Sequence, residues 1–168
     1  LKEDKAGLIT IAEKLGSVVP ADKKATQINR ILEVLYKEKT RYLETNMELL
    51  YSTIRRVLKQ RSLVVFFTNF ESMSGLERQL PFLKRISRFH LLLVVFFENT
   101  ELQKLSEEPA SNVEDIYIKT IAEKFAYDKK LIVKELAKHG IQSILSTPQN
   151  LTVNTINRYL ELKARQKI

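Results

Sequence analysis

Two short apolar runs, at residues 62–68 and 90–97, constrain this chain more than any other feature of its sequence. Both consist almost entirely of Val, Leu and Phe, with no alternation between apolar and polar side chains. Such runs are typical of strands buried on both faces of a parallel sheet, because alternation is expected only where one face meets water. Ligands of open α/β sheets bind beyond the carboxyl ends of the strands. The polar residues that follow the two runs are therefore the first candidates for a functional site.

Further strands and helices alternate around these runs. A strand at 6–12 is followed by an edge strand at 17–20, because a proline at position 20 suits an edge. Helical spacing predicts helices at 28–35, 47–58, 72–88 and 113–139. A strand is expected at 141–145, followed by a terminal helix whose buried stripe is Val153, Ile156, Tyr159 and Leu160. We expect Pro81 to break or restart its helix, Gly140 to end the long one, and residues 38–45 and 107–112 to form a loop and a turn. The alternation predicts one α/β domain over residues 1–168, with a three-layer, Rossmann-like, mostly parallel sheet and helices on both faces.

The expected core lies along the two apolar runs. With 44% apolar residues among 168, the chain can bury a sizeable core. We expect Val64, Val65, Phe66, Leu92, Val94 and Val95 to be nearly fully buried, with Ile121, Phe125, Ile156 and Leu160 packed over the sheet.

Composition excludes several classes of function. The chain has no cysteine, which excludes disulfides and thiolate sites, and no apolar stretch approaches the roughly 20 residues of a membrane span. We therefore expect neither a transmembrane helix nor a signal peptide in this stretch. The net charge of +8 invites a nucleic-acid interpretation. However, the basic residues are dispersed and no aromatic ladder accompanies them. Solvated helix faces explain the charge best, and an acidic protein partner or an anionic membrane surface explains it better than nucleic acid does.

No group of residues has the spacing of a catalytic or metal site. We interpret His90 and His139 as surface or helix-end histidines, because no Cys, Asp or Glu lies at the spacing of a metal site or a catalytic triad. Glu98 and Glu101 could pair as acid-base carboxylates, but a solvated loop explains them better. A hydrolase with carboxylates at Glu71 and Glu98 remains a third alternative. The expectation is a protein without enzymatic activity and without a cofactor.

Four segments carry a resemblance to a known family. They are Lys-Ala-Gly-Leu-Ile-Thr-Ile at 5–11, the stretch at 60–71 ending Phe-Phe-Thr-Asn-Phe-Glu, the stretch at 88–99 ending Phe-Phe-Glu-Asn, and Asn-Arg-Tyr-Leu-Glu-Leu-Lys-Ala-Arg at 157–165. They resemble the C-terminal part of the bacterial domain-of-unknown-function family fifty-eight, over nearly the whole chain. The resemblance implies a von Willebrand factor A-like fold, a parent protein tethered by N-terminal membrane helices, and a link to MoxR-type AAA ATPases.

The resemblance also implies a degenerate metal site. A von Willebrand A domain binds a divalent cation through an Asp-x-Ser-x-Ser loop after its first strand, a Thr and an Asp. We expect this chain to lack that first strand and loop, so that the domain is truncated at its N-terminus. The other two positions fall at Thr45, or Thr40, and at Asn69, which is neutral where a hard cation prefers a carboxylate. Thr45 fits a helix N-cap completed by Glu48, Asn69 fits a turn, and we expect no Mg²⁺ or Mn²⁺ site.

The absent strand implies open sheet edges. In the family's fold it lies between the strands at 6–12 and 62–68, and unpaired edges recruit another strand. We therefore expect these two strands either to pair directly or to mediate a homodimer.

Together these features predict a protein-interaction module on the cytoplasmic face of a bacterial membrane. Its partner would be a MoxR-type AAA ATPase in complex assembly or chaperoning, with membrane contact only through other parts of the parent protein. The alternative is a nucleic-acid-associated basic α/β domain. The expected contact rim comprises Thr45, Asn69, Glu71, Glu98, Asn99 and Thr100.

Overall fold

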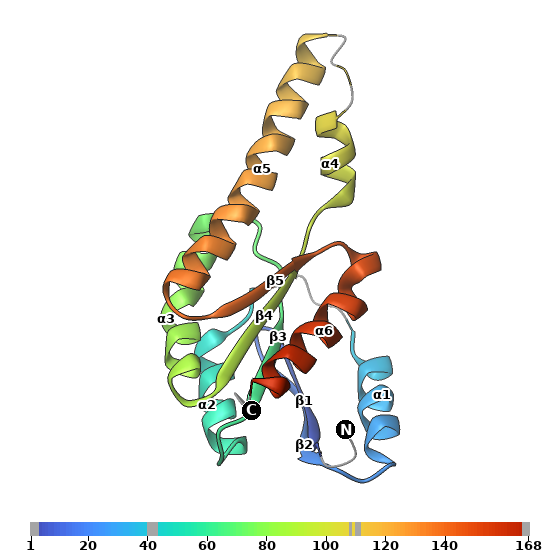
Figure 1. Ribbon diagram of the computed structural model, residues 1–168, viewed down its shortest axis with the longest axis vertical. Helices are drawn as coiled ribbons and strands as arrows, with labels where there is room; N and C mark the ends of the chain where they lie inside the picture. The colour runs from blue at the N-terminus through green and yellow to red at the C-terminus, as the bar shows by residue number, and fades with distance from the viewer. Residues whose placement is uncertain (1–3, 40–43, 108, 110–111, 166–168) are drawn as a thin grey trace. The chain divides into compact units, whose positions relative to one another are not determined.

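The computed structural model describes residues 4–39, 44–107, 109 and 112–165 (Figure 1). It divides the chain into two compact units, residues 1–59 and 60–168, and each is treated by itself below. The single domain expected over residues 1–168 stays a prediction.

The first unit is a β-hairpin with two helices. Strands β1 (Ala6–Ile11) and β2 (Leu15–Asp22) pair antiparallel, and helices α1 (Gln27–Lys37) and α2 (Met47–Val57) follow. The Gln27 side-chain amide ties α1 to the hairpin, because its Nε2 donates to the carbonyl oxygens of Ala6 and Pro20, each at 2.8 Å. The hairpin needs glycine at position 7, since a Cβ there would lie 2.8 Å from the Val19 carbonyl oxygen.

The hairpin corrects the expected sheet in two respects. The strand at 6–12 and the edge strand at 17–20 were assigned to the mostly parallel sheet, whereas β1 and β2 form a separate antiparallel sheet. Of the two alternatives for the strands at 6–12 and 62–68, direct pairing is wrong as well, because among the described residues β1 pairs only with β2 and β3 only with β4. A connection of three residues favours a hairpin, while parallel pairing needs a long crossover.

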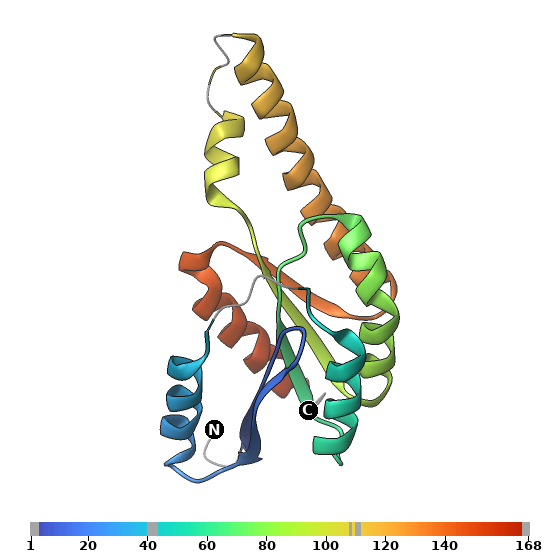
Figure 2. The same ribbon diagram turned by 180° about the vertical axis from the view of Figure 1, so that it is seen from behind.

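The second unit is a three-stranded parallel sheet with helices on both faces. Strands β3 (Leu63–Phe67), β4 (Leu91–Phe97) and β5 (Gln142–Ser146) lie in that order. Between them run α3 (Met73–Phe89), then α4 (Thr100–Glu107) and α5 (Val113–Lys138); a 3₁₀ turn η1 (Pro148–Asn150) leads to α6 (Leu151–Ala164). Figures 1 and 2 show α3 and α5 on one face of the sheet and α6 on the other. The α/β class with a parallel, helix-flanked sheet is therefore confirmed.

The core is centred on β4. Leu92, Val94 and Val95 are at most 2% exposed, as expected from the uninterrupted apolar run. The partner side chains come from both faces: Leu76, Leu83 and Ile86 of α3, Ile132 and Leu136 of α5, and Leu162 of α6.

The expected burial is wrong at the margins of this core. Val64, Val65 and Phe66 are half-buried rather than fully buried, because β3 is one of the two outer strands of the sheet among the described residues. On the helices, Ile121 is half-buried, Phe125 is 38% exposed, and Val153, Ile156 and Leu160 lie largely in solvent, with Tyr159 half-buried. The apolar stripe of α6 is thus only partly covered in the second unit.

One of three local predictions about helix ends and breaks is confirmed, and the other two are corrected. Gly140 ends α5 as expected, with the positive φ of 70° that glycine tolerates best. Pro81 does not break its helix, because α3 continues through it. The stretch before the turn at 107–112 forms α4, a short helix that was not predicted from the sequence. Residues 108, 110 and 111 of that turn lie outside the described residues.

Candidate functional site

The expected rim residues of the second unit gather at one edge of its sheet. Asn69 and Glu71 follow β3, Glu98 and Asn99 follow β4, and Thr100 begins α4. Since β3 and β4 are parallel neighbours, their carboxyl ends meet at the same edge. The structure therefore brings these five residues to one side of the sheet.

Thr45 belongs to the first unit, where it precedes α2. The N-cap of α2 is Asn46, whose side-chain oxygen accepts from the Leu49 backbone N–H at 3.0 Å. The capping box expected from Thr45 and Glu48 is therefore wrong by one residue. The alternative position, Thr40, lies outside the described residues.

A buried lysine completes the edge beside β3. Lys129 of α5 is only 9% exposed, and its Nζ donates to Oδ1 of Asn69 at 2.5 Å. The same ammonium lies 5.7 Å from the ring centroid of Phe96, within range of a cation-π interaction. Phe96 in turn packs against Phe70 in a T-shaped pair with centroids 5.7 Å apart. Asn69 is thus a partner of an internal cation rather than a simple turn former.

Burial lowers the pKa of the Lys129 ammonium, and the negative charge of Glu71 offsets part of this effect. The two causes oppose each other because burial disfavours the charged form, while a nearby carboxylate favours it. The strand edge therefore holds a cation supplied by the chain itself, next to an amide oxygen and near a carboxylate.

The lowered pKa of Lys129 predicts a specific pH dependence of stability. The unfolded chain holds the lysine proton more tightly than the folded chain, so stability rises with pH between the folded pKa and the unfolded value of about 10.4. We expect the wild type to gain stability relative to Lys129→Met over a series of pH values that rises towards about 10.4. Urea denaturation of both proteins at each pH measures this difference. A difference that stays constant or falls with pH would contradict the lowered pKa.

The polar residues after β4 form hydrogen bonds with nearby backbone groups. The Asn99 side-chain oxygen accepts from the N–H groups of Glu101 and Leu102, at 3.0 and 3.1 Å, and so starts α4. The Glu98 N–H donates to the carbonyl oxygen of Ser146, the last residue of β5, at 3.1 Å. Glu101 lies in the first turn of α4 rather than in the solvated loop that was expected.

The two histidines have different surroundings. His90 is the C-cap of α3, which confirms the helix-end position, one of the two alternatives expected for it, and it is only 6% exposed. His139 ends α5 as expected, with its Nε2 3.3 Å from Oε1 of Glu135.

Lys129 was not predicted from the sequence as a residue of this edge. It lies seven residues after Ala122 and three before Ile132, two buried positions of α5, so helical periodicity puts it on the apolar face. A lysine on an apolar face was the available signal, because a buried ammonium needs a partner.

Within residues 4–39, 44–107, 109 and 112–165, the structure contains no cluster of three or more His, Asp or Glu side chains that could hold a metal ion. In the same residues, no helix is long and apolar enough to cross a membrane. The expectations of no metal and no catalysis stay predictions.

Comparisons with known proteins find no family model, no curated protein and no solved structure that matches this chain. The resemblance to family fifty-eight and to von Willebrand A domains therefore stays a prediction.

Proposed function

We propose that this chain is a non-enzymatic protein-interaction module with a von Willebrand factor A-like fold. In this proposal it acts on the cytoplasmic side of a bacterial membrane with a MoxR-type AAA ATPase, in complex assembly or chaperoning. The identity of the partner rests on the sequence resemblance. The observation that carries the interaction role is that, among the described residues, β3 pairs with another strand on one side only.

One side of the β3 backbone pairs with no strand among the described residues. Ser62 accepts from the Leu91 N–H at 2.9 Å, and the Thr68 N–H donates to Val95 at 3.0 Å, so even-numbered residues face β4. Because successive backbone groups point to opposite sides, the N–H and C=O groups of Leu63, Val65 and Phe67 point away from β4. Among the described residues, β4 is the only strand that pairs with β3. Unpaired edges of this kind accept strands from other chains.

Exposed apolar side chains support an interaction role in each unit. In the second unit, Phe67 of β3 is 55% exposed and Ile156 of α6 is 51% exposed. In the first unit, Ile28 and Leu32 of α1 are 59% and 55% exposed. Ile28 and Leu32 lie four residues apart on α1 and therefore share one face of that helix. Apolar side chains gathered in this way mark contacts with other proteins more often than scattered ones do.

A proline at position 65 tests the edge directly. Val65→Pro removes an N–H that points away from β4, whereas Val65→Thr keeps it together with a β-branched side chain. We expect the wild-type chain alone to form a dimer through β3, and to bind a purified MoxR-type ATPase from the same organism. Val65→Pro should abolish the dimer and weaken ATPase binding by at least about tenfold, while Val65→Thr should preserve both. Light scattering and calorimetry measure the two effects.

Three outcomes would contradict the proposal. The first is a monomer that shows no affinity for the ATPase. The second is an equal loss in Val65→Pro and Val65→Thr, which would separate binding from the backbone edge. The third is nanomolar binding of a DNA or RNA duplex with a steep salt dependence, which would favour the nucleic-acid alternative suggested by the net charge of +8.

A further inference from the structure

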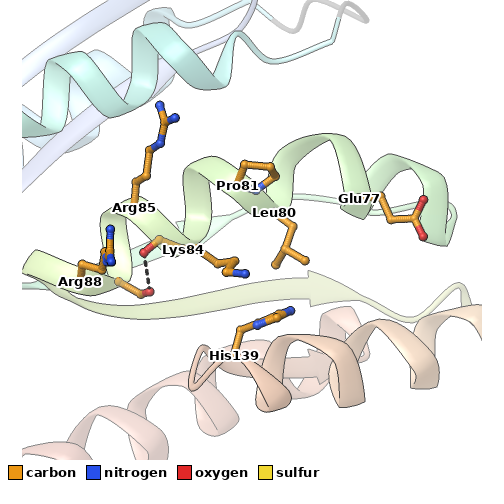
Figure 3. Close-up of a pocket in the computed structure, with 8 residues that line it drawn as sticks. Glu77, Leu80, Pro81, Lys84, Arg85, Arg88 and His139 are labelled. Carbon is orange, nitrogen blue, oxygen red and sulfur yellow. Dashed lines mark hydrogen bonds between the residues drawn. The ribbon is translucent and has the colours of Figure 1, made fainter.

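A groove of about 550 Å³ runs along α3 and ends at the last turn of α5. We call it the α3 groove; its lining includes Glu77, Leu80, Pro81, Lys84, Arg88 and His139. Figure 3 shows His139 facing Leu80 and Lys84 across the groove, with Glu77 and Arg88 towards opposite ends of α3. The groove lies entirely within the second unit and shares no residue with the edge of β3.

Positive charge gathers at one end of the α3 groove. Lys84 and Arg88 lie four residues apart on α3, where like charges repel, and Arg85 adds a third cation. None of the three forms an ion pair with a described residue; the Arg85 guanidinium lies 5.7 Å from the Phe82 ring instead. A basic residue in the last turn complements the helix dipole, which accounts for Arg88 but not for Lys84 one turn earlier.

The rest of the groove is not basic. Leu80 and Pro81 supply an apolar middle, and Glu77 supplies a carboxylate at the far end. Because Pro81 has no N–H, the carbonyl oxygen of Glu77 lacks its usual helical donor. A ligand that fits this order carries negative charge at one end, an apolar group in the middle and a hydrogen-bond donor at the other end.

We propose that the α3 groove binds an acidic peptide segment of a partner protein. Two carboxylates of the segment contact Lys84 and Arg88, an aliphatic side chain packs on Leu80 and Pro81, and a backbone N–H reaches the Glu77 carbonyl oxygen. A nucleic acid fits less well, because the Glu77 carboxylate repels phosphate and no aromatic side chain is among the described residues that line the groove. This site is additional to the edge of β3 and does not depend on the proposed ATPase partner.

A labelled model peptide tests the groove on the complete chain. The probe is a fluorescein-labelled twelve-residue peptide with Asp and Glu at one end, two central Leu residues and uncharged polar residues at the other end, titrated by fluorescence anisotropy. We expect micromolar affinity that the double variant Lys84→Glu/Arg88→Glu weakens by at least about tenfold. The matched control, Lys124→Glu/Lys134→Glu, makes the same charge change at exposed positions of α5 outside the groove and should weaken binding less than about threefold.

Amide chemical shifts in wild-type protein give a second measurement that does not depend on the variants folding. Binding of the peptide should shift the signals of residues 77–88 and 139 selectively. Equal weakening in both double variants, shifts spread over other helices, or no binding at millimolar peptide would each overturn the proposal. So would tighter binding of a labelled twelve-nucleotide oligo-dT that the groove variant alone abolishes, which would assign the groove to nucleic acid.

Discussion

Phe96→Ala is expected to lower the free energy of unfolding by about 4 kcal/mol, within the range of large-to-small changes in protein cores. Phe96 is 0% exposed at the centre of the parallel sheet. The truncation removes its T-shaped contact with Phe70 and its cation-π contact with Lys129, and it leaves a cavity between the sheet and its helices. Chemical denaturation of the complete chain measures the loss.

Phe67→Ala is the matched control for this prediction. Phe67 ends the neighbouring strand and is 55% exposed, so its truncation should cost less than about 1 kcal/mol. Similar losses for Phe67→Ala and Phe96→Ala would show that β4 is not the centre of the core.

Lys129→Glu is expected to cost about 3 kcal/mol, because it places an uncompensated negative charge in a buried position. The new carboxylate would lose the hydrogen bond that Lys129 Nζ donates to Asn69 and would lie near the carboxylate of Glu71. The loss should appear as a lower denaturation midpoint with an unchanged slope.

Two variants separate charge from position. Lys130→Glu makes the same charge change at the adjacent exposed residue and should alter stability by no more than about 0.5 kcal/mol. Lys129→Met keeps the length of the side chain without its charge and should be neutral or stabilising at neutral pH, since Asn69 is exposed and can bond to water. A loss in Lys129→Met as large as in Lys129→Glu would show that the ammonium itself stabilises the fold.

The burial expected from the sequence is correct for β4 and wrong for β3. Both apolar runs form strands, but only Leu92 to Phe96 are buried throughout, while Val64 to Phe66 are half-buried. Both runs consist mainly of Val, Leu and Phe, so their apolar character does not distinguish them. Their burial differs because β4 has a strand on each side, whereas β3 pairs only with β4 among the described residues.

The candidate site was predicted in part. The residues after β3 and β4 were identified because parallel strands end at a common edge, and the structure places Asn69, Glu71 and Glu98 there. Lys129 was missed because it lies 60 residues from Asn69 along the chain, and only the packing of α5 brings its ammonium to that amide.

By itself, the sequence determined the local structure of this protein: the strands, the long helices, and the glycine that ends α5. These features follow from apolar periodicity and backbone preferences, which act over a few residues. Tertiary structure alone decided that β3 pairs on one side only among the described residues and that a lysine of α5 is buried beside Asn69. Strand pairing and burial depend on which distant segments meet, and a short apolar segment is compatible with several partners.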